Sequence, residues 1–318
     1  MFSVRYLTAF NKTARVILRG KMIGELAALG SAVSWTVSAM LYGKALQREK
    51  PVSANIVRLA CTSPFLLILL GIAAWSGGLG NLSQNVAILA GISGIIGLGL
   101  GDTLYMLSLK LMGVSRAVPI TCTYPLFNIL WAVLLIGEKL TLFRVLGALI
   151  IFSGIWLLSY GKGNSDGEGQ SRFLLRGLLA ALVTAILWSI SIALMGIAIN
   201  ETPRLNDALV INTIRTVTVG ALLLGMSPII DRQRDFLKMK KETVATLTVG
   251  GLVALGLGWF FLAYSFTGIP ETQAVPISST TPLFSTLAAV ILLHEKITLK
   301  NALGSVIVVA GIFMIFIV

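Results

Sequence analysis

One stretch of 25 residues occurs twice in this chain, and the duplication constrains the fold more than any other feature. Residues 117–141 read AVPITCTYPLFNILWAVLLIGEKLT, and residues 274–298 read AVPISSTTPLFSTLAAVILLHEKIT. The two copies carry two pairs of prolines spaced 157 residues apart: Pro119, Pro125, Pro276 and Pro282. An interior proline costs a soluble helix about 3 kcal/mol, whereas in a membrane bundle neighbouring helices and Ser/Thr side chains satisfy the freed carbonyls. We therefore expect these prolines to be hinges in two membrane helices.

The overall composition also places the chain in a lipid bilayer. Of its 318 residues 56% are hydrophobic and only 12% are charged, and the mean hydropathy is +0.90. This leaves too little polar surface for a soluble protein of this size. A net charge of +12 would suggest nucleic acid in a soluble protein, but the basic residues gather between apolar runs, as the positive-inside rule describes. We expect a multi-pass protein of the cell membrane with no nucleic-acid partner.

Ten apolar runs approach the roughly 20 residues that a membrane span needs. They lie at about 24–45, 53–75, 86–109, 115–136, 142–160, 175–198, 208–229, 243–266, 272–293 and 299–318. Gly-rich residues of mixed charge separate the fifth run from the sixth. These boundaries predict a basic N-terminal segment (1–23), a first five-helix unit (24–160), a flexible linker (161–174) and a second five-helix unit (175–318).

The repeat extends over both units. Residues 24–35 match residues 177–188, each ending on a tryptophan, and Asn55 and Arg58 recur as Asn212 and Arg215. Because five is an odd number, the second unit must cross the membrane in the opposite sense to the first. The predicted fold class is therefore an all-α integral membrane protein with ten transmembrane helices arranged as two inverted five-helix repeats. Many secondary transporters build a midplane site from such repeats.

The orientation and the true start of the chain stay open. The side of the membrane bearing both termini has eight Lys and Arg residues in its loops and the other side has fifteen, which places both termini outside. Residues 1–23 contain five basic residues and, before the span begins, no acid. This segment reads as an amphipathic surface helix, as an Arg-rich targeting segment, or as an over-long gene start with Met22 as the first residue.

The duplicated five-span unit, the Trp35 and Trp188 pair, and the AVPI…PLF…EK ending of each fourth helix resemble the EamA-type family of the drug/metabolite transporter superfamily. The resemblance covers about residues 23–318. It implies a ten-helix bundle, a central cavity lined by the first, third and fourth helices of each half, and alternating access driven by a proton or substrate gradient. It also implies that both termini are cytoplasmic, which conflicts with the charge count.

Polar residues repeat on one expected face of the fourth and ninth helices. Thr121, Tyr124, Asn128 and Trp131 follow helical spacing, and Ser278 and Thr281 are the counterparts of the first two. In lipid such a face either joins helices or lines a cavity. Trp35 and Trp188 lie in mid-helix rather than in an interfacial belt. The candidate substrate-binding residues are Trp35, Asp102, Tyr105, Thr121, Tyr124, Asn128, Trp188, Trp259, Ser278 and Thr281.

Asp102 is the acid that the sequence singles out, because it lies well inside the third apolar run. A membrane aspartate costs about 2.5–3.5 kcal/mol on the insertion scale, so it needs a partner or water. Arg58 enters the membrane from the same side. Two interpretations follow: a structural ion pair between Asp102 and Arg58, or an Asp102 that exchanges a proton or binds a cationic substrate group.

Enzymatic and cofactor chemistry find little support. Cys61 and Cys122 lie in apolar runs, and no metal or cofactor motif occurs, so we expect neither. Residues 91–94 spell the GxSG of rhomboid-like intramembrane proteases, with His294 as the only candidate base. We predict a secondary active transporter, permease or exporter, of a small metabolite or drug-like solute. The rival functions are a passive channel and, less strongly, that protease. Small-residue helix faces leave a homodimer open.

Overall fold

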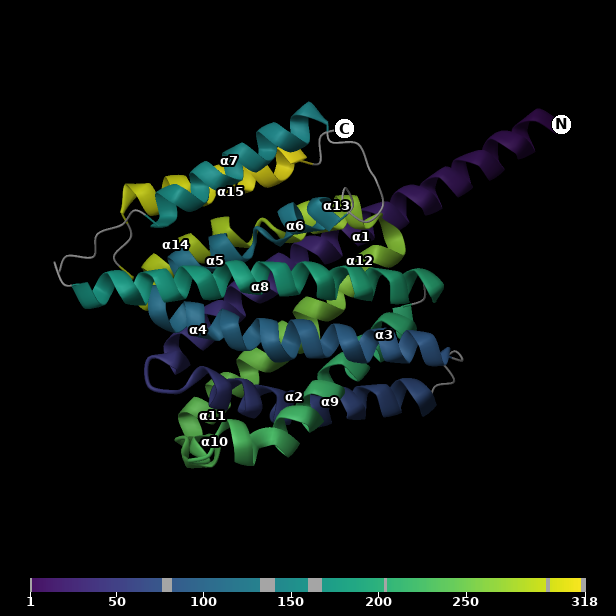
Figure 1. Cartoon of the computed structure of the whole chain (residues 1–318). Coiled ribbons are helices and arrows are strands. Elements are labelled where there is room, and N and C mark those ends of the chain that lie inside the picture. Colours follow the sequence, from purple (N-terminus) through teal and green to yellow (C-terminus); the bar gives the residue numbers. More distant parts are fainter. Residues whose placement is uncertain are drawn as a thin grey trace.

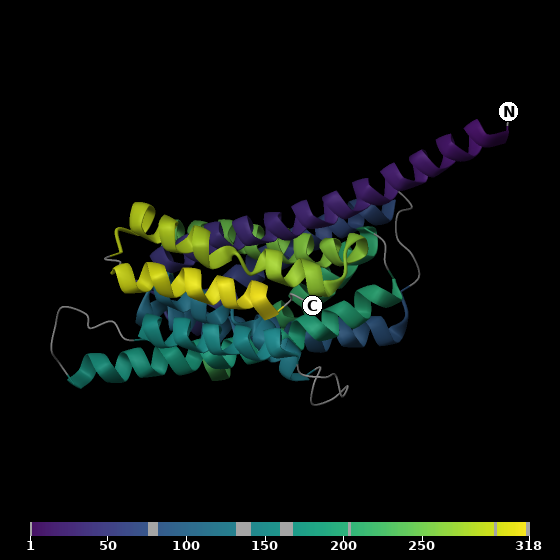
Figure 2. The ribbon, with the colours of Figure 1, turned by 90° about the horizontal axis from the view of Figure 1, so that it is seen from above.

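The structure, a computed structural model, describes residues 2–75, 82–131, 141–159, 168–202, 205–295 and 298–315. Side chains are described for residues 21–75, 82–131, 141–158, 173–202, 206–295 and 298–315. Over these ranges the secondary structure is helical, without a strand. Figure 1 shows the helices running roughly side by side, with the N-terminal part of α1 extending beyond the bundle. Figure 2 shows the same extension from above.

Seven α-helices and one π-helix lie in the described part of the first half of the chain. They are α1 (Phe2–Leu46), α2 (Pro51–Trp75), α3 (Gln84–Gly94), the π-helix η1 (Ile95–Gly101), α4 (Asp102–Met112), α5 (Val114–Thr121), α6 (Tyr124–Trp131) and α7 (Leu142–Ser159). The predicted basic segment 1–23 is helical from Phe2 and runs without a break into the first span.

The second half has a similar order of elements. They are α8 (Glu168–Glu201), α9 (Leu205–Ile230), α10 (Asp235–Lys238), α11 (Lys241–Gly251), the π-helix η3 (Leu252–Gly258), α12 (Trp259–Gly268), α13 (Glu271–Ser278), α14 (Thr281–Leu293) and α15 (Leu299–Ile315). Helix α8 begins at Glu168, inside the stretch expected as linker, and residues 161–167 of that stretch lie outside the described residues.

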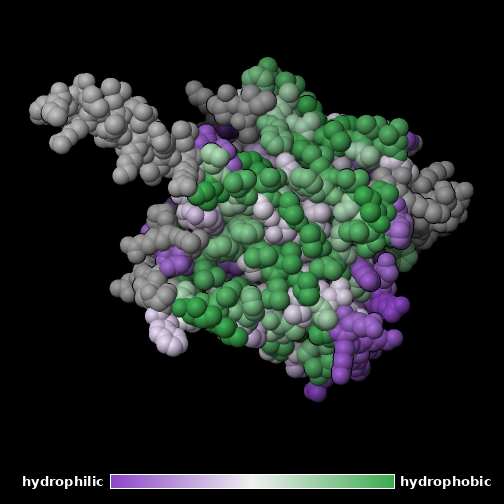
Figure 3. All heavy atoms as spheres, turned by 180° about the vertical axis from the view of Figure 1, so that it is seen from behind, coloured by the Kyte–Doolittle hydropathy of each residue, from purple (hydrophilic) through white to green (hydrophobic). Residues whose placement is uncertain are grey.

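Seven helical segments of the described chain are long and apolar enough to cross a membrane. They are 21–46, 51–75, 84–112, 173–201, 206–230, 241–268 and 271–293. Two shorter apolar helices, 142–158 and 299–315, match two further predicted runs. The remaining run, 115–136, corresponds to α5 and α6 and continues into residues outside the described part. Figure 3 shows a broad hydrophobic surface between hydrophilic residues gathered near both ends, as a lipid-facing protein requires.

The duplicated stretch forms a broken helix in both copies. Helix α5 ends at Thr121 and α6 begins at Tyr124, and α13 and α14 are interrupted at the equivalent place. The second proline of each pair lies in the first turn of the following helix, where its missing N–H costs no helical bond. The hydroxyls of Thr123 and Thr280 donate to carbonyls of the preceding helix, both at 2.7 Å. The run expected over 115–136 is therefore broken where proline and threonine end α5, and the two prolines expected as hinges, Pro119 and Pro125, lie on either side of this break.

Helices α7 and α15 pack against each other through glycines. A Cβ atom at Gly154 would lie 3.0 Å from the carbonyl oxygen of Gly304, and one at Gly147 would lie 2.8 Å from that of Gly311. The side of the bundle formed by this pair is visible in Figure 1. Elsewhere α2 packs against α9, α4 against α8, and α1 against α12. Each of these contacts joins the two halves, and the aromatic and polar core lies between them.

Candidate functional site

A cavity lies in the middle of the bundle, where both halves contribute side chains. Its aromatic wall comes from six residues: Trp35, Tyr42, Tyr105, Tyr124, Trp188 and Trp259. Its charged residues are Arg58 of α2 and Asp102 of α4. Trp35 of α1 meets Trp259 of α12 edge to face, with ring centroids 5.2 Å apart. Trp188 of α8 also meets Trp259, with ring centroids 6.5 Å apart, so both tryptophans predicted from mid-helix positions, Trp35 and Trp188, pack against Trp259 inside the bundle.

Eight of the ten predicted substrate-binding residues line this cavity. They are Trp35, Asp102, Tyr105, Thr121, Tyr124, Trp188, Trp259 and Thr281. Ser278 lies behind the wall, where its hydroxyl oxygen is 2.9 Å from the hydroxyl oxygen of Tyr124. The break at Cys122 and Thr123 interrupts the expected polar face, and Asn128 on α6 does not line the cavity.

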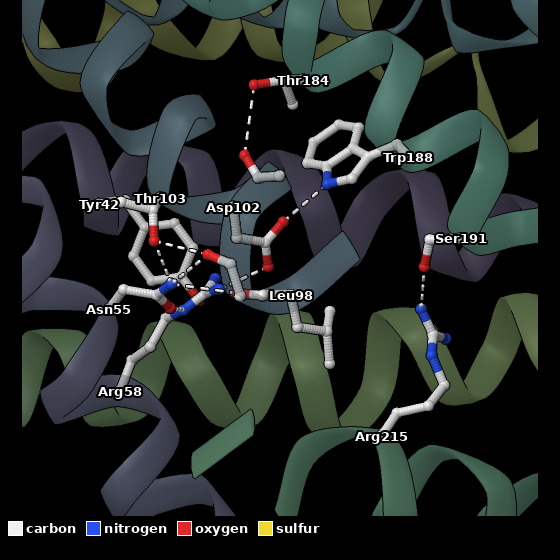
Figure 4. A network of polar contacts seen from close by, with 12 residues as sticks. Tyr42, Asn55, Arg58, Leu98, Asp102, Thr103, Thr184, Trp188, Ser191 and Arg215 are labelled. Carbon is white, nitrogen blue, oxygen red and sulfur yellow. Dashed lines mark hydrogen bonds and ion pairs between the residues drawn. The ribbon is translucent and has the colours of Figure 1, made fainter. Parts of the chain in front are cut away.

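Asp102 lies at the centre of a buried polar network, which we call the Arg58 cluster: Tyr42, Asn55, Arg58, Asp102 and Trp188. Figure 4 shows Asp102 between the guanidinium of Arg58 and the indole of Trp188. Arg58 Nη2 and Asp102 Oδ2 form an ion pair, and Trp188 Nε1 donates to Asp102 Oδ1 at 2.8 Å. Both charged side chains are almost fully buried. Asp102 thus has a charged partner and a neutral one, which buried carboxylates in a membrane require.

Asn55 holds Arg58 in place and connects it to the π-helix. Arg58 Nε donates to Asn55 Oδ1 at 2.9 Å, and Asn55 Nδ2 donates to the carbonyl oxygen of Leu98 at 3.0 Å. Arg58 Nη1 also donates to the hydroxyl of Tyr42 at 3.3 Å. A π-helix disturbs the regular backbone ladder, and such segments are frequent at functional sites. Here η1 ends directly before Asp102 and so sets the direction in which that side chain leaves the helix.

The counterpart of Arg58 has a different environment. Arg215 of α9 is fully buried, and its guanidinium carbon lies 4.3 Å from the ring centroid of Trp259. Arg215 Nη2 donates to Ser191 Oγ at 3.1 Å (Figure 4). Among the described residues no carboxylate lies within ion-pair distance of it.

Three features of the site were not foreseen. Neither π-helix is predicted from the sequence, although both are rich in glycine and each accepts a hydrogen bond from a repeated asparagine, Asn55 for η1 and Asn212 for η3. Cys122 is buried and also lines the cavity, which its position in an apolar run does not predict. Arg215 could have been noticed from its match to Arg58 combined with the match of Asp102 to Trp259.

The arrangement around Ser93 differs from that of a serine protease. The Ser93 hydroxyl is buried and donates to the carbonyl oxygen of Ser191 at 2.7 Å. His294 ends helix α14 in a left-handed conformation, with φ of 53°. Within the described part of the chain, no group of three or more His, Cys, Asp and Glu side chains is placed to hold a metal ion.

Comparison with known proteins assigns the family. The model of the EamA-like transporter family matches residues 22–160 and again residues 175–317. The chain belongs to the EamA-like transporter family. An uncharacterized transporter of Archaeoglobus fulgidus is 24% identical over 294 residues, which cover 92% of this chain and 98% of that protein. The uncharacterized transporter YvbV of Bacillus subtilis is 24% identical over 192 residues, 59% of this chain and 57% of its relative.

A solved crystal structure has the same fold as this EamA-like protein. The two chains superpose with a TM-score of 0.61 at 20% identity, over 92% of this chain and 95% of the other. The family and the relatives' names identify a multi-pass membrane transporter of the drug/metabolite type and point away from an enzyme. The resemblance read from the two tryptophans and the duplicated proline stretch is thus confirmed.

Proposed function

We propose that this protein is a secondary active transporter of the cell membrane that moves a small metabolite or drug-like solute by alternating access. In this proposal ten transmembrane helices form two inverted five-helix repeats, and the substrate binds in the central cavity. The observation that carries it is the cavity itself, which is aromatic, has a buried ion pair, and takes its wall from equivalent helices of both halves.

The positions of the structural elements support the repeat. The starts of η1, α5, α6 and α7 at residues 95, 114, 124 and 142 recur at 252, 271, 281 and 299. Each of these pairs is 157 residues apart, the same shift as in the sequence. Inverted repeats of this kind let one structure open to either side by exchanging the conformations of its halves.

Contacts between the halves at one end of the bundle support a closed gate there. The backbone N–H groups of Val114 and Ser115, which begin α5, donate to the carboxylate of Glu295 at 2.7 and 3.0 Å. A carboxylate at a helix N-terminus is stabilised by the helix dipole. The counterpart of Glu295 is Glu138, which lies outside the described residues. We propose that breaking the Glu295 contacts accompanies opening at this end.

The broken helices supply the moving parts in this proposal. Helices α5 and α6 meet at Cys122 and Thr123, and α13 and α14 meet at Ser279 and Thr280. Cys122 lines the cavity, as does Thr281 directly after the second break. Hinges are commonly a few element-terminal residues that absorb changes in backbone dihedrals. Proton coupling through Asp102 stays a prediction. Its test is an Asp102→Asn variant, whose transport should lose the pH dependence seen in the wild type.

Ligand screening followed by flux measurement tests the proposed function. A ligand can be identified by thermal unfolding of the purified protein in the presence of amino acids, organic acids, sugars, nucleotides, vitamins and cationic drugs. A ligand at 100 times its Kd stabilises the folded state by about 2.7 kcal/mol. Proteoliposomes preloaded with that ligand should then accumulate labelled ligand transiently. A passive channel equilibrates the label without such an overshoot, and that result would contradict alternating access.

A further inference from the structure

The repeat places a second polar cluster opposite the Arg58 cluster. We call it the Arg215 cluster, and its members are Trp35, Met195, Asn212, Arg215 and Trp259. Asn212, Arg215 and Trp259 follow Asn55, Arg58 and Asp102 by 157 residues, and Met195 follows Tyr42 by 153. Trp35 contacts Trp259 as its counterpart Trp188 contacts Asp102. The two clusters are therefore two versions of one arrangement.

Two contacts of the Arg215 cluster have equivalents in the Arg58 cluster. Asn212 Nδ2 donates to the carbonyl oxygen of Leu255 in η3 at 2.7 Å, as Asn55 does to Leu98 in η1. Arg215 Nη1 lies 2.6 Å from Met195 Sδ, where Arg58 Nη1 has the hydroxyl of Tyr42. The backbone and the guanidinium thus have equivalent positions.

The Arg215 cluster lacks the anion of the Arg58 cluster. Arg58 has Asp102, whereas Arg215 has the ring of Trp259. Arg215 Nε and Asn212 Oδ1 both have no hydrogen-bond partner, although their counterparts bond each other at 2.9 Å. Arg215 and Asn212 are both fully buried. A half-satisfied charged network in a membrane interior is unfavourable unless another group completes it.

A carboxylate is the group that fits this deficit. The planar guanidinium binds a carboxylate through two parallel hydrogen bonds, which a neutral or cationic group cannot reproduce. The two buried arginines and one buried aspartate of the clusters leave one positive charge uncompensated. The neighbouring wall is formed by tryptophan and tyrosine rings, so the remainder of such a ligand would be apolar or aromatic.

We propose that Arg215 is the anion receptor of the transport cycle and that the substrate is a small organic carboxylate. The inference rests on the proposed alternating access. Arg58 lines the cavity here, while Trp259 separates Arg215 from it. Exchange of conformations between the halves brings Arg215 into the position that Arg58 now has. Arg58 keeps Asp102, which belongs to its own half, so the arginine that arrives without a carboxylate is Arg215.

Matched ligand pairs test this assignment in the full-length purified protein. The probes are benzoate, phenylacetate and indole-3-acetate, each paired with its amide, with benzylamine as a cationic control. Binding is followed by tryptophan fluorescence at millimolar concentration. The wild type should bind at least one carboxylate about tenfold or more tightly than its amide, as expected for loss of a charge-assisted bidentate contact. Arg215→Gln should abolish that discrimination, and Arg215→Lys should retain part of it because the charge remains without the fork.

Lys50→Gln, at the surface, is the control and should leave the discrimination unchanged. Equal binding of acids and amides, preference for benzylamine, discrimination that persists in Arg215→Gln, or no binding by any carboxylate would each overturn the anion assignment. Transport of neutral or cationic solutes alone would also overturn it and leave the transporter function standing. Carboxylates that bind at Arg215 but show no flux in proteoliposomes would instead contradict the proposed function.

Discussion

Replacing the two equivalent arginines by methionine should have different effects on the free energy of unfolding. In Arg58→Met the buried Asp102 loses its ion-pair partner and keeps only the 2.8 Å bond from Trp188. Removing one partner of a buried pair costs about 3–5 kcal/mol. In Arg215→Met no carboxylate is left unpaired. This variant loses the cation–π contact with Trp259, which contributes about 2 kcal/mol when desolvated. It also removes a buried charge, whose desolvation costs the folded state several kcal/mol, and this gain offsets the loss.

We therefore expect Arg58→Met to lower the free energy of unfolding by about 3–5 kcal/mol, and Arg215→Met to leave it unchanged or to raise it. The measurement is unfolding in mixed micelles with increasing SDS, followed by circular dichroism. The double variant Arg58→Met/Asp102→Asn should recover about 1–3 kcal/mol relative to Arg58→Met, which measures the coupling of the pair. Equal losses in both single variants would refute the charge assignment for the two clusters.

Three further predictions concern packing, gating and pH. Gly154→Ala should lower the free energy of unfolding by about 1–3 kcal/mol, because the added methyl group would lie 2.7 Å from Val308 Cγ2 and 3.0 Å from the Gly304 oxygen. Gly71→Ala is the control and should not destabilise the protein, because its methyl group would have no atom within 4 Å. Glu295→Gln should raise the labelling rate of Cys122 from the Glu295 end about tenfold or more, since charge-assisted hydrogen bonds contribute about 1.5–3 kcal/mol; an unchanged rate would exclude the gate. The hydrogen bond from Lys50 lowers the pKa of Asp235. The Lys50–Asp235 pair therefore stabilises the folded state at pH values above the unfolded pKa of Asp235, and this stabilisation is lost as the pH falls through the lowered folded pKa. Lys50→Met should flatten the dependence of the free energy of unfolding on pH in this range. A pH dependence identical to that of the wild type would contradict this.

Much of the architecture was predictable because it follows from local chemistry. Apolar runs fix which segments enter the membrane, and the seven long spans match predicted runs. The family was recognisable because Trp35, Trp188 and the duplicated proline stretch are sequence features. The helix breaks needed one further step, namely that proline and threonine together end α5 before Tyr124. The number of ten transmembrane helices stays a prediction.

The site was predictable in part from depth in the membrane and in part from the helical spacing that singled out Thr121, Tyr124 and Thr281. Trp35, Trp188 and Asp102 were singled out by their mid-span positions, and all three line the cavity. Asn128 was included by extending a helical period across Cys122 and Thr123, where the helix does not continue. The π-helices depend on backbone registry that glycine content does not specify. The difference between Arg58 and Arg215 lies in which residues the fold brings to them, and a linear pattern does not contain that.

The native cysteine in the cavity gives the most direct test of alternating access. Cys122 lines the site, and Cys61 can be removed by Cys61→Ser. In proteoliposomes of this variant, a membrane-impermeant thiol reagent is applied to one face at a time, with Cys61→Ser/Cys122→Ser as the blank. The proposed mechanism predicts labelling of Cys122 from both faces. Carboxylates whose binding requires Arg215 should slow this labelling from one face. Labelling from a single face under all conditions would contradict the mechanism.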